Sequence, residues 1–259
     1  MNTNPSFVKR YSLVIFFVLA YALSWGSVLI FGGPFLFPLW VLLAAFIMAG
    51  LTGGLKDLLS RMFRWRVGIQ WYAAAFLLPV VIALAAVSLN LLLGAHMSSA
   101  SLPGPWYSIF PLFLGVMLDA PFWEETGWRG FAMPRFSANR SPLSNTVILG
   151  VILAGWHLPL ALSEPGISVP YLLGAFSSAF ATNWIYYNTK GSALLPMLYH
   201  TAANTIGPYF FRNFSGTEQI TYYWLLVGMT LAAGIVIVLA TGPSLQRRGV
   251  QAVETAPAD

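Results

Sequence analysis

Long apolar stretches alternate with short polar segments along this chain. Several of the apolar stretches reach the roughly 20 residues that a helix needs to cross a bilayer. We expect eight crossings, at residues 11–32, 35–54, 70–94, 108–126, 142–163, 168–188, 191–211 and 220–242. The pattern therefore predicts an all-α membrane protein, built as a bundle of about eight transmembrane helices.

The polar segment between the second and third expected crossings has a helical period of its own. Its apolar residues recur at helical spacing, namely Leu55, Leu58, Leu59, Met62 and Phe63. The basic residues Lys56, Arg64 and Arg66 fall elsewhere around the helix. This predicts an amphipathic helix on the cytoplasmic surface, with its basic residues near anionic lipid headgroups. A solvated linker is the alternative.

Composition agrees with a membrane protein. The chain is 58% hydrophobic and 8% charged, with a mean hydropathy of +0.71. It has no cysteine, which excludes disulfides, thiolate metal sites and a cysteine nucleophile. We expect residues 1–243 to form a single polytopic membrane domain, with residues 108–212 as its motif-bearing core. Residues 244–259 are polar and lack apolar periodicity, which predicts a disordered cytoplasmic tail.

The basic residues predict the orientation of the bundle. With eight crossings, twelve of the thirteen lysines and arginines lie on the face that carries both termini, and only Arg212 lies on the other. The positive-inside rule then places both termini in the cytoplasm. The net charge of +5 follows from this topology, so it does not indicate nucleic-acid binding. Membrane lipid is the expected surrounding, and a bacterial or archaeal plasma membrane the expected location.

Ionisable and strongly polar residues interrupt the apolar stretches at three places. These residues are Glu124, Glu125 and Arg129 in the first, His157 in the second, and His200 with Asn204 in the third. An ionisable side chain near the bilayer centre costs roughly 2.5–3.5 kcal/mol even on lenient insertion scales. We therefore interpret these residues as a catalytic site.

Spacing suggests different tasks for the two glutamates. Glu125 and Arg129 are four residues apart and share a helix face, which allows an ion pair. Glu124 then points about 100° away and is free to face a different partner. One carboxylate would stay ionised beside the arginine, while the other could take protons. An ordinary interfacial charge cluster is the alternative.

The histidines lie on two other expected crossings. His200 and Asn204 share one helix face, and His157 lies deeper in the fifth crossing. A lone intramembrane histidine is as often a helix–helix hydrogen bond, but two of them together with a glutamate pair favour function. Pro121, Pro159 and Pro196 each lie within about a turn of one polar group. This favours one shared, hydrated pocket.

Three motifs carry a resemblance to a known family. They are Glu124-Glu125-Thr-Gly-Trp-Arg129, Leu153-Ala-Gly-Trp-His157 and His200-Thr-Ala-Ala-Asn204. They resemble the Glu-Glu-x-x-x-Arg, Phe-x-x-x-His and His-x-x-x-Asn motifs of the CAAX-prenyl-protease and bacteriocin-processing (Abi) family of intramembrane proteases. The resemblance covers about residues 115–210. It departs at Leu153, which stands where the family usually has a phenylalanine in a packing position.

The resemblance implies roles for these residues. Glu124 would activate water, with His157 orienting or deprotonating it, while His200 and Asn204 would polarise the substrate carbonyl. Glu125 and Arg129 would support the first glutamate and the helix end. A metal is an open question: zinc could be held by Glu124, His157 and His200, although the metal-free route is slightly favoured. The substrate would be a membrane-associated, prenylated or leader-type peptide or protein that enters from the bilayer.

Two other functions remain open. A proton-coupled transporter could use the same glutamate and histidines as a relay, although we find no duplicated half of the kind that many transporters carry. A non-catalytic membrane protein that helps to mature other proteins is the second alternative. The sequence does not predict the oligomeric state or the identity of the substrate.

Overall fold

The computed structural model describes residues 7–31, 37–98, 105–163 and 166–246. All regular structure within these ranges is helical. The elements are α1 (Phe7–Arg10), α2 (Ser12–Phe31), α3 (Leu39–Thr52), α4 (Leu55–Met62), α5 (Ile69–Leu92), η1 (Trp106–Ser108), α6 (Ile109–Asp119), α7 (Pro121–Glu125), η2 (Thr126–Ala132), η3 (Met133–Arg135), α8 (Pro142–Trp156), α9 (Leu158–Ser163), α10 (Ser168–Asn188), α11 (Leu194–Phe211), α12 (Gly216–Thr241) and η4 (Gly242–Ser244). The predicted all-α fold is confirmed.

Two of the eight expected crossings are broken into shorter helices. The stretch 108–126 divides at Ala120 into α6 and α7, and the stretch 142–163 divides at His157 into α8 and α9. Within the described residues, three helices are both long and apolar enough to span a bilayer, namely Ser12–Phe31, Ile69–Leu92 and Gly216–Ser244. The total of eight crossings stays a prediction.

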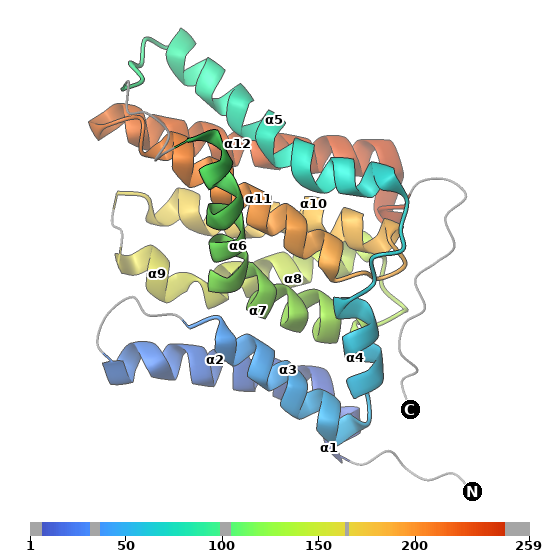
Figure 1. Ribbon diagram of the computed structural model, residues 1–259. Helices are drawn as coiled ribbons and strands as arrows, with labels where there is room; N and C mark the ends of the chain where they lie inside the picture. Colours follow the sequence, from blue (N-terminus) through green and yellow to red (C-terminus); the bar gives the residue numbers. More distant parts are fainter. Residues whose placement is uncertain (1–6, 32–36, 99–104, 164–165, 247–259) are drawn as a thin grey trace, which may run out of the picture.

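The long helices lie side by side in the bundle (Figure 1). α10 lies in its interior, where it packs against α8, α11 and α12, and α5 packs against α11 and α12. α3 packs against α2, α7 and η2 at the opposite edge. α6 runs across the other helices in this view and contacts α7 and α11. The interior position of α10 and α11 explains why these helices can carry polar side chains.

The outer surface of the bundle is apolar. Leu29, Ile69, Leu92 and Leu239 each expose 80% or more of their surface. Contiguous exposed apolar surface of this kind is rare in soluble monomers and marks contact with a membrane or a partner. Together with the long apolar helices, it supports an integral membrane protein.

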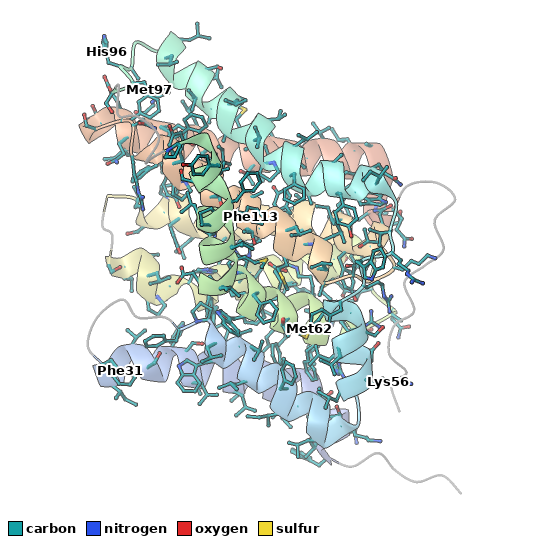
Figure 2. The ribbon with its side chains drawn as sticks, in the orientation of Figure 1. Phe31, Lys56, Met62, His96, Met97 and Phe113 are labelled. Atoms are coloured by element: carbon teal, nitrogen blue, oxygen red, sulfur yellow. The ribbon has the colours of Figure 1, made fainter. Side chains whose placement is uncertain are left out.

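The predicted amphipathic helix is present as α4, but its contacts differ from the expectation. Leu58 and Met62 are buried in the main core of the protein, and α4 packs against α3 and η2. Leu55 and Phe63 remain exposed. Figure 2 places Lys56 of α4 at the opposite end of the bundle from His96. Part of the apolar face of α4 is thus covered by protein, namely Leu58 and Met62, while Leu55, Leu59 and Phe63 stay exposed.

The start of the predicted tail packs against α10. Leu245 is buried, and its carbonyl oxygen accepts a hydrogen bond of 2.7 Å from Asn188 Nδ2. Gln246 Nε2 donates to Tyr187 O at 3.3 Å. Residues 247–259, to which the prediction of disorder mainly applies, lie outside the described residues.

Candidate active site

All six predicted site residues line one cavity of about 530 Å³. Glu124 and Glu125 come from α7 and Arg129 from η2, His157 lies at the junction of α8 and α9, and His200 and Asn204 come from α11. The structure therefore brings together three motifs that are up to 80 residues apart in the sequence. Their roles stay predictions.

The helix break at Ala120 positions the glutamate pair. Ala120 has φ −136° and ψ −54°, between the end of α6 at Asp119 and the start of α7 at Pro121. The residue before a proline is disfavoured in the α conformation, because the proline ring crowds its backbone. Proline is well accepted as the first residue of a helix. The new helix carries Glu124 and Glu125 in its last turn, and both are buried.

The chain continues from α7 into a π-helical segment, η2, in which every residue is buried. Such wide turns are rare and are frequent at functional sites. η2 approaches α3 so closely at Gly127 that an added Cβ atom would overlap Val41 Cγ1 and lie 3.1 Å from Val41 O. A residue without a side chain is therefore needed at this contact.

Glu124 is the less constrained of the two glutamates. Its Oε2 accepts a long hydrogen bond of 3.4 Å from Trp128 Nε1, and the described residues provide no cation within ion-pair distance. Its side chain lines the cavity although only 4% of its surface is exposed. The carboxylate is therefore available to a molecule that enters the cavity.

Glu125 is held by two partners. Its Oε1 accepts hydrogen bonds of 3.0 Å from Arg129 Nη1 and 3.0 Å from His200 Nδ1. The predicted Glu125–Arg129 ion pair is thus confirmed, and both side chains are only 2% exposed. The contact with His200 across 75 residues of sequence was not predicted. Glu125 therefore orients a histidine of the third motif, as well as supporting its own helix.

Arg129 contacts two residues that the sequence analysis did not place in the site, and one of them contacts a third. Arg129 Nε donates to Asn183 Oδ1 at 2.9 Å, and Nη2 donates to Thr182 Oγ1 at 2.5 Å. Asn183 Nδ2 in turn donates to Thr146 Oγ1 at 3.1 Å. These three residues are buried. The sequence signal for these contacts was the pair of adjacent polar residues, Thr182 and Asn183, in the middle of a largely apolar stretch.

The position of His157 depends on the end of α8. His157 is the first residue after that helix, and its Nδ1 lies 2.9 Å from Leu153 O. A carbonyl oxygen can only accept, so Nδ1 carries a proton and Nε2 of the neutral ring keeps a free lone pair. Tyr21 and Trp25 of α2 donate to the carbonyl oxygens of Ile152 and Trp156. These bonds satisfy backbone groups near the interrupted helix end.

Aromatic rings surround His157. Its ring lies 4.8 Å from that of Trp156 and 5.7 Å from that of Tyr171, measured between centroids. Trp156 also packs edge-on against Trp128 at 5.7 Å. The carboxylate of Glu124 and the ring of His157 thus meet the cavity beside large, weakly polar side chains.

Asn204 lies one turn after His200 on α11 and lines the cavity. It makes no hydrogen bond to another side chain or backbone group in the described part of the protein, so its amide is available to a ligand. Asp119, which we expected to make a packing or partner contact, also lines the cavity.

Two polar residues far from the cavity contact each other. His96 Nδ1 lies 3.4 Å from Glu218 Oε1, and the side chains are 91% and 32% exposed. His96 lies at the end of the bundle opposite Lys56 (Figure 2). Glu218 belongs to the first turn of α12. Asn90 of α5 donates to Glu218 O at 3.0 Å.

The cavity was tested as a metal site. Across the described residues, no group of three or more His, Cys, Asp or Glu side chains is arranged to hold a metal ion. The Nδ1 atoms of His157 and His200 are engaged with Leu153 O and Glu125 Oε1. Nε2 stays available on both rings, and metal-ligating histidines commonly donate their other ring N–H to a carboxylate or carbonyl oxygen in this way. Zinc stays a prediction from the sequence.

Comparison with known proteins identifies the same part of the chain. Residues 104–206 match the family described as type II CAAX prenyl endopeptidase Rce1-like, and all six site residues fall within this range. A similar protein is CAAX prenyl protease 2 of Methanococcus maripaludis, which is 24% identical over 164 residues. The aligned region covers 58% of this chain and 60% of that protein. The chain thus matches about three fifths of its relative's length.

Proposed function

This chain belongs to the CAAX-prenyl-protease and bacteriocin-processing family, and we propose that it is an intramembrane endopeptidase. The observation that carries the proposal is the cavity in which Glu124, His157, His200 and Asn204 meet. These residues supply the two functions that hydrolysis of a peptide bond requires. One function is to activate water, and the other is to stabilise negative charge on the carbonyl oxygen.

Glu124 is the proposed general base. Its carboxylate has no cation partner among the described residues and receives only one long hydrogen bond, from Trp128. His157 assists through Nε2, since its Nδ1 proton is bound to Leu153 O. The water oxygen would attack the carbonyl carbon while its proton passes to Glu124. That proton would then reach the leaving nitrogen as the carbon–nitrogen bond breaks.

His200 and Asn204 are the proposed oxyanion donors. The Asn204 amide can donate two hydrogen bonds. His200 can donate through Nε2 when the ring is an imidazolium, and Glu125 Oε1 at 3.0 Å offsets that positive charge. Fixed donors act strongly on a developing charge at a site from which water is largely excluded. Glu124, which has no cation partner among the described residues, thus serves as the base. Glu125, which is bonded to His200, supports the donor that stabilises the carbonyl oxygen.

The proposed substrate is a membrane-associated peptide or protein of the prenylated or leader type. The relative's name refers to a CAAX prenyl protease, and the apolar exterior supports entry from the bilayer. The small residues Gly174, Ala175 and Ser178 of α10 line the cavity, which leaves room for an extended backbone. We propose a plasma-membrane location with both termini in the cytoplasm, as the basic residues predict.

The decisive experiment compares protein termini in membranes from cells that carry either the intact protein or Glu124→Gln. We expect new termini with the intact protein only. Once a substrate is known, the purified variant should cleave it about 100- to 10,000-fold more slowly, the range for loss of a general base. Gln keeps the size of the side chain and can still accept from Trp128, so folding should be preserved.

Glu218→Gln is the matched control, because it makes the same chemical change far from the cavity. It should produce the termini of the intact protein. If intact protein and Glu124→Gln, equally abundant and folded, gave identical termini under several growth conditions, the peptidase proposal would be rejected. Proton-coupled flux and the capture of membrane partners would then be measured.

A further inference from the structure

A continuous line of hydrogen bonds runs from α8 to the cavity histidine of α11. Asn183 Nδ2 donates to Thr146 Oγ1 at 3.1 Å, and Asn183 Oδ1 accepts from Arg129 Nε at 2.9 Å. Arg129 Nη1 donates to Glu125 Oε1, which also accepts from His200 Nδ1, each at 3.0 Å. The first four side chains are at most 2% exposed. The line therefore lies almost entirely out of contact with solvent.

The direction of each hydrogen bond is determined by chemistry. The two ends of an asparagine amide are hard to tell apart by shape alone. Here Arg129 has only donors, so Asn183 must present its oxygen to the guanidinium. Its nitrogen then faces Thr146, whose hydroxyl oxygen can accept. Reversing the amide would place two donors against each other at a buried site and leave both without an acceptor.

The same reasoning determines the state of His200. Glu125 Oε1 already accepts from a guanidinium, so it is a carboxylate oxygen with acceptor capacity only. His200 Nδ1, at 3.0 Å, must therefore carry the shared proton. Glu125 Oε2 is buried without a hydrogen-bond partner among the described residues. All orientation of His200 by this carboxylate thus depends on the one oxygen that Arg129 holds.

We propose that Thr146 and Asn183 are positioning residues that hold His200 with Nδ1 protonated and Nε2 presented to the cavity. Without the Thr146 hydroxyl, Asn183 Nδ2 is left buried without its acceptor, and the amide is held in place by Arg129 alone. Arg129 then has a weaker anchor on α10, and Nη1 shifts relative to Glu125 Oε1. The effect on cleavage rests on the proposed function, whereas the effect on the His200 ring does not.

The first test observes the ring directly. The chain has three histidines, so selective ¹⁵N labelling of histidine gives three pairs of ring signals in lipid nanodiscs. His200→Gln assigns the relevant pair. We expect protonated Nδ1 and unprotonated Nε2 in the neutral His200 ring of the intact protein. In Thr146→Val, which removes the hydroxyl but keeps the shape, a second population with protonated Nε2 should appear.

Thr146→Ser is the control, since it keeps the hydroxyl and removes a methyl group. It should retain the His200 signals of the intact protein, whereas a packing role would make Thr146→Ser harmful and leave Thr146→Val, which keeps the shape, close to the intact protein. Asn183→Leu should change the His200 signals most. If Asn183→Leu does not fold, the comparison of Thr146→Val with Thr146→Ser still tests the proposal. A neutral His200 ring that carries its proton at Nε2 instead of Nδ1 in the intact protein, or His200 signals that are unchanged in folded Thr146→Val, would overturn the proposal.

The second test uses a substrate identified from the new termini. We expect kcat to fall in Thr146→Val by less than the roughly 10- to 100-fold loss known for direct partners of metal-ligating histidines, because Asn183, Arg129 and Glu125 separate Thr146 from His200. KM should change little, and Thr146→Ser should regain most of the lost rate. A loss confined to KM would contradict a positioning role. If the intact protein cleaves nothing, the proposed function fails, while the NMR result still supports or rejects the positioning of His200.

Discussion

The protein contains two glutamate–histidine pairs in opposite environments. Glu125 and His200 lie 3.0 Å apart, with side chains 2% and 21% exposed, and Arg129 shares the same carboxylate oxygen. Glu218 and His96 lie 3.4 Å apart at one end of the bundle, with side chains 32% and 91% exposed. The chemistry of the two contacts is the same. What differs is the number of additional partners and the access of solvent.

This difference determines what each pair can do. An exposed ion pair changes the free energy of folding little when it forms, because water and salt compete with it. A buried carboxylate and guanidinium must keep every partner, because each unpaired charge carries a large desolvation cost. The buried pair can therefore direct the geometry of a site. The exposed pair can at most stabilise the loop that it touches.

The largest effect is expected from Glu125→Gln. The change leaves the guanidinium of Arg129 buried without its anion, and breaking a buried pair typically costs about 3–5 kcal/mol. We expect a strong loss of folded protein and a lower thermal unfolding midpoint in detergent. The double variant Glu125→Gln/Arg129→Met should regain part of the stability, because no unpaired charge remains. An unfolding midpoint as high as that of Glu218→Gln would contradict this account.

An intermediate effect is expected from Thr182→Val. Thr182 Oγ1 accepts a hydrogen bond from Arg129 Nη2, and hydrogen bonds to charged groups contribute about 1.5–3 kcal/mol. Thr189, which directly follows α10, is the matched control, since it is also buried but donates only to backbone carbonyl oxygens. Thermal unfolding should show a larger loss for Thr182→Val than for Thr189→Val. Equal losses would mean that Arg129 does not depend on Thr182.

Sequence patterns predicted the local part of the site better than the distant part. The ion pair of Glu125 and Arg129 follows from a spacing of four residues on one helix, and it is present. The contact of Glu125 with His200 spans 75 residues, and no periodicity within one helix reports a partner on another. The contact of Asn183 with Arg129 likewise joins two separate helical segments, and the sequence analysis did not foresee it.

The helix breaks were missed although their cause was visible. Pro121 and Pro159 were interpreted as signs of a hydrated pocket, while the stretches around them were predicted as continuous crossings. The backbone before a proline resists the α conformation, and the first stretch breaks at Ala120, directly before Pro121. The second stretch breaks at His157, two residues before Pro159. For α4, the amphipathic period predicted a helix correctly. It could not show that Leu58 packs against η2 and not against lipid, because the same apolar residues suit contact with protein and contact with lipid.

The smallest effect is expected from Glu218→Gln, which tests the exposed half of the comparison. Exposed ion pairs contribute at most about 1 kcal/mol, and a glutamine oxygen can still accept from the backbone amide of His96, now bonded to Glu218 Oε2 at 3.1 Å. The unfolding midpoint should therefore stay close to that of the intact protein.

Salt provides the sharper measurement for this pair. The Debye length falls from about 30 Å at 0.01 M to about 3 Å at 1 M, so any difference between Glu218→Gln and the intact protein should vanish at high salt. The loss caused by Glu125→Gln should persist, because ions do not reach a carboxylate that is 2% exposed. If salt changed the loss of stability equally in Glu125→Gln and Glu218→Gln, burial would not distinguish the two pairs. The Glu125–His200 contact would then orient its histidine no better than the surface contact does.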